Sequence, residues 1–152
     1  MNIVAIDLGT KTGWAIARAD GSIVFGTHVC KADGRKEIDG LRYARFRSLL
    51  SKLQKNIDSI DQVFFEKVES HSSTYAAQVY GGYKAILEMF CAINEIPCTG
   101  IPVGTIKKFT TGKGNADKDQ MVEAVKALGF KVKDDNQADA IAILLCSKKV
   151  KS

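Results

Sequence analysis

Three acidic residues occur inside segments of the chain that are otherwise apolar. Asp7 follows the run VAI, Glu66 follows the run VFF, and Asp139 lies within the run ADAIAI. Burying a carboxylate is costly unless it is paired or bound to a cation. Carboxylate and water ligands select hard divalent ions such as Mg²⁺ or Mn²⁺. The pattern therefore predicts a metal site to which Asp7, Glu66 and Asp139 all contribute.

Two neighbours of Asp139 compete for the place of a fourth ligand. Asp135 lies four residues earlier, so a helix would stack the two carboxylates one turn apart on one face. Asn136 lies three residues earlier, points roughly the same way and offers an amide oxygen. Asp134 is instead expected to cap or favour the N-terminus of that helix. Either Asp135 or Asn136 thus completes the predicted site.

Ligands of this kind predict phosphodiester hydrolysis with two divalent ions. Two ions about 4 Å apart can activate water and stabilise the leaving oxygen of a phosphodiester. We expect Asp7 to bridge both ions, with Glu66 on one side and Asp139 with the fourth ligand on the other. Hydrolysis would then leave 5′-phosphate and 3′-hydroxyl ends without a covalent intermediate.

Hydrophobic periodicity predicts the elements that must position these acids. The expected strands are 2–9, 11–18, 22–29, 61–68 and 98–103. The expected helices are 40–57, 74–94 interrupted by Gly81-Gly82, 105–111, 116–128 capped by Asn115 and ended by Gly129, and 135–149. This order predicts an α/β fold in one domain over residues 1–152. Its mixed five-stranded sheet has three antiparallel strands, then two parallel ones, with helices on both faces.

Composition, charge and cysteine spacing bear on the binding partner and on the cellular compartment of the protein. The 152 residues are 45% hydrophobic and 26% charged, and the net charge is +5. Lysines crowd the stretch 107–118, a pattern typical both of nucleic-acid binding and of a solvated surface. The four cysteines lack C-x-x-C spacing, which favours reduced thiols in a reducing compartment. Neither a signal peptide nor an apolar run of membrane-spanning length is visible, so we expect a soluble, cytoplasmic protein.

Four motifs, in order, resemble the RuvC-type Holliday junction resolvases. IDLGTKTGWA at 6–15 resembles the opening strand of that family, and Glu66 after its apolar run resembles the second acid. QADAIA at 137–142 is similar to an element of the family's last helix. The basic stretch 106–118, with its G-x-G, follows another family segment. The resemblance spans nearly the whole chain, from residue 2 to about 148.

The resemblance implies an RNase H-like fold and a metal-dependent endonuclease that resolves Holliday junctions and other branched DNA in recombination and repair. It implies a homodimer whose two active sites nick strands symmetrically. Asp7, Glu66 and Asp139 become the metal ligands. Lys107 and Lys118 match lysines near the scissile phosphate in this family, where a cation offsets developing charge.

The chain departs from the family pattern in three places. Asn136 stands where an acid or histidine is usual, a role that a one-residue shift would give to Asp135. Glu69 replaces an aromatic that wedges into the junction in bacterial enzymes; Tyr75 or His71 are the alternatives, although a solvent-facing polar loop is the first expectation for His71. The sequence Gly81-Gly82-Tyr83 makes the dimerisation helix unusual. In these three places the chain resembles virus-encoded relatives, which often act on a broader set of branched DNAs.

Three other interpretations share some of these residues. The motif DLGT also resembles the phosphate-binding hairpin of actin-like ATPases, but those proteins need two such domains. An RNase H-like nuclease acting on RNA or an RNA–DNA hybrid would use the same carboxylates, although the lysines of 107–118 favour the resolvase. A catalytically weak junction-binding protein would result if neither Asp135 nor Asn136 completed the site, and weak Mn²⁺ binding would reveal it.

Overall fold

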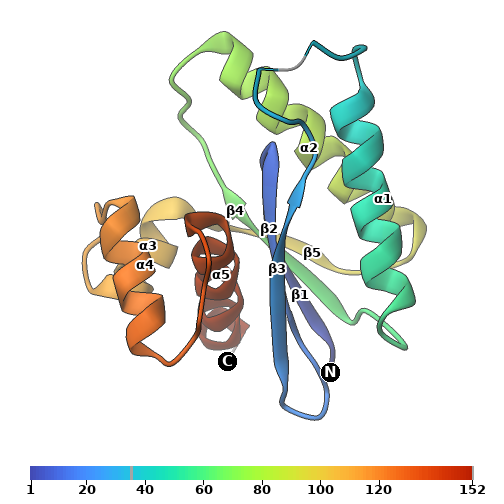
Figure 1. Ribbon diagram of the computed structural model, residues 1–152. Helices are drawn as coiled ribbons and strands as arrows, with labels where there is room; N and C mark the ends of the chain where they lie inside the picture. Colours follow the sequence, from blue (N-terminus) through green and yellow to red (C-terminus); the bar gives the residue numbers. More distant parts are fainter. Residues whose placement is uncertain (35, 152) are drawn as a thin grey trace.

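The computed structural model describes residues 1–34 and 36–151, so Arg35 and Ser152 of the predicted domain lie outside the described residues. The described residues form five strands and five helices (Figure 1). In chain order they are β1 (Ile3–Asp7), β2 (Lys11–Ala17), β3 (Ile23–Val29), α1 (Leu41–Lys55), β4 (Gln62–Lys67), α2 (Thr74–Ile93), β5 (Cys98–Pro102), α3 (Val103–Thr111), α4 (Lys118–Ala127) and α5 (Asp135–Lys151).

The strands form one mixed sheet in the order β3-β2-β1-β4-β5. Strand β2 pairs antiparallel with β1 and β3, whereas β4 pairs parallel with β1 and β5. Helices α1 and α2 cover one face of the sheet, and α3, α4 and α5 lie on the other (Figure 1). The five-stranded sheet with helices on both faces, predicted from the sequence, is therefore confirmed.

Alternation along the strands divides the apolar side chains between two cores. In β1, Ile3 and Ala5 belong to the core under α5, whereas Val4 and Ile6 belong to the core under α1 and α2. Strand β4 alternates in the same way, with Phe64 on the α5 side. A residue two positions beyond the last member of either series points to the same face of the sheet as that series. This decides where the acids at the strand ends point.

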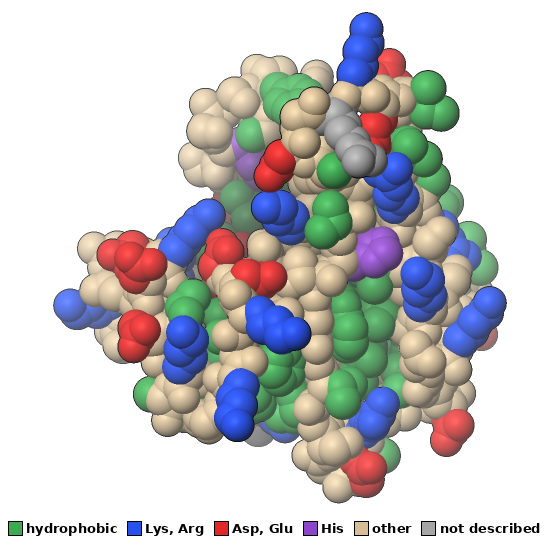
Figure 2. Space-filling model, viewed as in Figure 1, with side chains coloured by type: hydrophobic (Ala, Val, Ile, Leu, Met, Phe, Trp, Pro, Cys, Tyr) green, Lys and Arg blue, Asp and Glu red, His purple; other side chains and the backbone are tan. Residues whose placement is uncertain are grey.

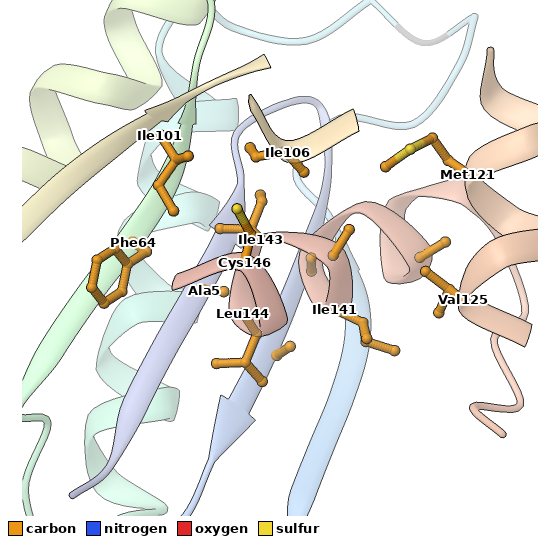
Figure 3. Close-up of a cluster of buried hydrophobic side chains, with 14 of the residues drawn as sticks. Ala5, Phe64, Ile101, Ile106, Met121, Val125, Ile141, Ile143, Leu144 and Cys146 are labelled. Atoms are coloured by element: carbon orange, nitrogen blue, oxygen red, sulfur yellow. The ribbon is translucent and has the colours of Figure 1, made fainter. Parts of the chain in front are cut away.

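Helix α5 is buried on more than one side. Its alanines Ala138, Ala140 and Ala142 are at most 1% exposed, and such small side chains allow a helix to lie close to a sheet. Figure 3 shows its apolar side chains among those of the strands on one side and Met121 and Val125 of α4 on another. Among the described residues, no helix combines the length and the apolar character needed to cross a membrane.

The predicted interruption of α2 at Gly81-Gly82 is wrong, because the helix runs continuously from Thr74 to Ile93. Gly82 has a packing role instead. A Cβ at this position would lie 2.6 Å from the ring of Tyr43 on α1, so its absence lets the two helices approach. The penalty that glycine carries in a helix is thus offset by tertiary packing.

The predicted cap of α4 is also wrong. Asp117, not Asn115, caps this helix, and its side chain accepts the backbone N–H of Gln120 at 2.8 Å. The side chain of Gln120 accepts the backbone N–H of Asp117 in return, and this reciprocal pair outcompetes a single cap two residues earlier. Helix α3 begins at Val103, two residues before the predicted start, whereas Gly129 follows α4 with φ of 97° as expected of a helix-ending glycine.

Candidate metal centre

The ends of two neighbouring parallel strands bring Asp7 and Glu66 together. Ile6 of β1 pairs with Phe65 of β4, so the next residue of each strand is the acid. Each acid follows, by two residues, a side chain of the core under α5, and both therefore point to the α5 face. Asp7 and Glu66 are half-buried at this edge.

Helix α5 presents Asp139 and Asp135 at the same edge, one turn apart, and the charges of both act on the acid of β1. The start of the helix is held by Asp134, whose Oδ1 accepts the backbone N–H of Gln137 at 2.8 Å. The side chain of Gln137 in turn accepts the backbone N–H of Lys133 at 2.9 Å. The capping role predicted for Asp134 is confirmed.

Gly13 allows α5 to come this close to the sheet. It is the residue of β2 that pairs with Asp7. A Cβ at Gly13 would lie 1.9 Å from the backbone oxygen of Asn136 and 2.5 Å from its carbonyl carbon. Because both atoms belong to the backbone of α5, no side-chain rotation can relieve the clash. Gly13 therefore sets the distance between Asp7 and the acids of α5.

We expect Gly13→Ala to push the first turn of α5 off the sheet and to lower the free energy of unfolding by about 3 kcal/mol. Urea unfolding followed by circular dichroism measures this loss. Gly9→Ala is the matched control, because a Cβ at Gly9 meets only the oxygen of Lys11, at an ordinary 3.9 Å. Equal stability of the two variants would contradict the role assigned to Gly13.

Burial and neighbouring carboxyl groups raise the pKa of Asp7 and Asp139 at this edge. Burial, then Asp139, Glu66 and Asp135, raise the pKa of Asp7 well above its ordinary value, against the opposing charge of Lys118. Burial, then Glu66 and Asp135, raise the pKa of Asp139 to about 7. Burial also raises the pKa of Glu66, against the charge of a lysine on α3. The edge thus concentrates negative charge where solvation is poor, so that a cation would be favoured there.

Two lysines border the acids, and acidic and basic side chains adjoin one another over the N-terminal end of α5 (Figure 2). The Nζ of Lys118 lies 3.4 Å from Oδ2 of Asp135, and its side chain is 83% exposed. Lys107 is half-buried, and its charge acts on Glu66 and Asp139. Lys118 is the first residue of α4, where the helix dipole disfavours a cation, so its position there benefits the acids rather than the helix.

The donor set fits a hard divalent ion. Asp7, Glu66, Asp135 and Asp139 offer carboxylate oxygens, which are the ligands that Mg²⁺ and Mn²⁺ prefer. No three His, Cys, Asp or Glu side chains of the described residues converge into a ready-made cage for one ion. Mg²⁺ commonly keeps several waters and takes only one or two protein carboxylates, so ions that share these acids need no such cage.

The candidates for a residue that wedges into DNA lie in the loop after β4 and at the start of α2. Glu69 is 73% exposed and pairs with Lys67 at 3.2 Å. Tyr75, at the start of α2, is 63% exposed. His71 lies in the loop, as expected, and is half-buried, with its ring packed on that of Tyr80 at 4.9 Å between centroids.

Two residues that position the acids, Gly13 and Gln137, are not among the site residues predicted from the sequence, although the sequence carries a signal for each. A glycine inside a strand, such as Gly13, marks a close backbone approach. Gln137 is a polar residue that borders the apolar run around Asp139, and a buried amide needs hydrogen-bond partners. Neither signal names the partner, which is the backbone of α5 for Gly13 and the amide of Lys133 for Gln137.

Comparison with protein families places most of the chain within one of them. Residues 3–147 match the family model described as crossover junction endodeoxyribonuclease RuvC. A RuvC protein of Wolbachia from Brugia malayi is 29% identical over 159 residues, covering 99% of this chain and 95% of that protein. The RuvC protein of Chloroflexus aggregans is also 29% identical, over 156 residues, covering 96% of this chain and 92% of its own length.

Solved structures show the same fold. Thermus thermophilus RuvC in complex with a Holliday junction substrate superposes with a TM-score of 0.81 at 20% identity, covering 99% of this chain and 94% of that one. The yeast mitochondrial Holliday junction resolvase superposes with a TM-score of 0.63 at 11% identity, covering 95% of this chain and 76% of that one. The RNase H-like architecture expected from the sequence is therefore confirmed.

Proposed function

Because this chain belongs to the RuvC family of crossover junction endodeoxyribonucleases, we propose that it hydrolyses Holliday junctions and other branched DNA with divalent metal ions. The observation that carries the proposal is the meeting of four carboxylates at one edge of the sheet, where burial and three of them raise the pKa of the fourth, Asp7. Acids that only stabilised the fold would be balanced by cations or hydrogen-bond donors; Asp135 pairs with Lys118, but at Asp7 the other carboxylates and burial outweigh that lysine. Carboxylates that repel one another in the folded protein are typical of a functional site.

Each side chain of the edge has its own part in this proposal. Two Mg²⁺ or Mn²⁺ ions, when bound, supply an activated water and a positive charge beside the leaving 3′ oxygen. Asp7, Glu66, Asp135 and Asp139 would hold these ions, with Asp7 as the acid on which the other three all act. Lys107 and Lys118 border the acids and offset the charge that develops on the scissile phosphate. The products carry 5′-phosphate and 3′-hydroxyl ends.

We assign the fourth ligand to Asp135 rather than to Asn136. The charge of Asp135 acts on both Asp7 and Asp139, and its carboxylate pairs with Lys118. Asn136 meets the sheet through its backbone carbonyl, against Gly13. Asn136 therefore places the helix, and Asp135 is the donor that already shares the electrostatic environment of the other three acids.

In chelator, the melting temperature should fall by roughly 5 °C as pH rises from 5 to 8. The pKa of Asp139 is raised to about 7 and that of Asp7 is raised as well, whereas unfolded carboxyls titrate near pH 4. The folded chain therefore holds more protons across this window, and stability declines as pH rises through it. Thermal melts of wild type and Asp139→Asn measure the effect, and Mn²⁺ at pH 8 should restore wild type. A stability that rises with pH in both proteins would contradict the repulsion among the acids.

A homodimer is the proposed active form, because symmetric cleavage of a four-way junction needs two sites. Helix α2 supports this, since it buries one side against α1 and exposes large apolar side chains elsewhere: Tyr75, Met89 and Ile93 are 63%, 52% and 72% exposed. Exposed apolar groups on one element are typical of an interface. The resemblance to virus-encoded relatives extends the proposed substrates to three-way junctions and flaps, cleaved in the cytoplasm of the host cell.

A panel of labelled substrates tests the proposed function: a four-way junction, a three-way junction, a flap, a linear duplex and an RNA–DNA hybrid, each with Mg²⁺, Mn²⁺ or chelator. We expect metal-dependent cleavage of the branched DNAs, with the linear duplex spared. Cleavage of the hybrid alone would keep the carboxylate site but move the function to RNA. Tight junction binding without cleavage would identify a junction-binding protein that lacks activity.

A further inference from the structure

One tyrosine of α2 bonds the backbone at the acid of β4 and two residues after it. The hydroxyl of Tyr80 donates to the backbone oxygen of Glu66 at 2.8 Å. The same hydroxyl accepts the backbone N–H of Val68 at 3.1 Å. A single hydroxyl thus bridges the backbone from the Glu66 carbonyl to the Val68 amide, and the contact joins α2 to the edge of the sheet that carries the acids.

The end of β4 has a reason to need such support. Lys67, the residue after Glu66, pairs with Pro102 of β5. Strand β1, on the other side, ends at Asp7 and pairs with β4 only as far as Phe65. Glu66 therefore pairs with Ile101 of β5 but lies beyond the last pair with β1, and the Tyr80 hydroxyl bonds its backbone oxygen there.

The ring of Tyr80 is itself fixed. It packs on His71 with 4.9 Å between centroids, and the two residues belong to the loop and the helix that follow β4. The helix start is fixed by Ser73, whose side chain accepts the backbone N–H of Ala76 at 3.0 Å. These contacts fix both ends of the loop from β4 to α2, so the hydroxyl of Tyr80 is held at a fixed position relative to Glu66.

We propose that Tyr80 is a positioning residue that holds the Glu66 carboxylate in place for the divalent ion, acting through its two hydrogen bonds to the β4 backbone. The proposal rests on the function proposed above only in taking Glu66 as a metal ligand. Partners that orient a ligand typically change metal affinity or activity by about 10- to 100-fold when they are removed. Tyr80 acts on the backbone of the ligand rather than on its side chain, so an effect at the lower end is expected.

Tyr80→Phe is the test, because it removes the hydroxyl and keeps the ring against His71. We expect the Mn²⁺ affinity of the DNA-free protein, measured by titration of the free-ion paramagnetic resonance signal, to fall about 10-fold. The kcat for junction cleavage should fall by a similar factor, while KM for the junction stays within about 2-fold. Hydrogen exchange of the Val68 amide should accelerate. Tyr43→Phe, which removes a phenolic hydroxyl on α1, is the matched control and should change none of these values by more than about 2-fold.

A cycle with Glu66→Gln separates positioning from a general loss of structure. If Tyr80 acts through Glu66, Tyr80→Phe should weaken Mn²⁺ binding little further in the Glu66→Gln protein, because coupled residues are not additive. An equal loss in both backgrounds, an unchanged Mn²⁺ affinity, or a raised KM with kcat unchanged would each overturn the proposal. If the wild type binds Mn²⁺ but cuts no DNA, the proposed function fails, and the Mn²⁺ titration still decides the role of Tyr80.

Discussion

Asp7→Asn is expected to lose metal-dependent cleavage by at least about 10³-fold, or roughly 4 kcal/mol in the barrier, while still binding branched DNA. Asp7 lies next to Glu66 in the sheet and opposite the acids of α5, so no other carboxylate can take its place. Asparagine keeps the shape and removes the charge that the ions require. Single-turnover cleavage of a labelled four-way junction, beside a binding assay in Ca²⁺ or chelator, measures both effects.

The same variant should be more stable than wild type when no divalent ion is present. Asp7 is the acid on which burial and three other carboxylates act together, and asparagine relieves that repulsion. We expect a melting temperature higher by a few degrees in chelator at pH 8, and no further gain on adding Mn²⁺. Asp58→Asn is the control, because Asp58 is an exposed acid near the opposite end of β1. Wild-type cleavage by Asp7→Asn would refute the assignment of the site.

The second large effect is expected from Asp135→Asn, which should slow cleavage by about 10²-fold, or roughly 2.7 kcal/mol. Its carboxylate is the one that pairs with Lys118 and acts on both Asp7 and Asp139. Asn136→Ala, one residue along the same helix turn, should change the rate by less than about 3-fold. Single-turnover rates over a range of Mn²⁺ concentrations compare the two variants.

The opposite order of cleavage rates in Asp135→Asn and Asn136→Ala would lead to a different assignment of the fourth ligand. A severe loss in Asn136→Ala, with Asp135→Asn near wild type, would make the amide the fourth ligand and leave Asp135 as a partner of Lys118. A large loss in both variants would indicate that the first turn of α5 has been displaced. Gly13→Ala provides the reference for that displacement, because its Cβ would meet the backbone of Asn136 itself.

The acids could be found in the sequence because burial and charge conflict there without any knowledge of the fold. Asp7 and Glu66 each end an apolar strand, and period-two alternation decides which face of the sheet they share. The stacking of Asp135 and Asp139 follows from helical geometry alone, and so does the cap by Asp134. The identification of each acid and of the cap depends on residues no more than four apart, whereas the face that Asp7 and Glu66 share depends on the pairing of β1 with β4.

The remaining details depend on contacts between distant elements. Gly13 and Tyr80 act only once α5 lies on β2 and α2 lies beside the end of β4. The continuity of α2 through Gly82 likewise depends on Tyr43 of another helix, which outweighs the low helix propensity of glycine. Asn115 and Asp117 are both good caps by residue type, and the return bond from Gln120 decides between them.

The most direct test of the central claim is to map and religate the nicks that the wild-type protein makes in a four-way junction labelled on each strand in turn. The proposed site predicts metal-dependent nicks, paired at symmetric positions in two opposite strands. DNA ligase should seal them, because hydrolysis at the carboxylates leaves 5′-phosphate and 3′-hydroxyl ends. Nicks that persist in chelator, or ends that ligase cannot seal, would contradict hydrolysis at Asp7, Glu66, Asp135 and Asp139.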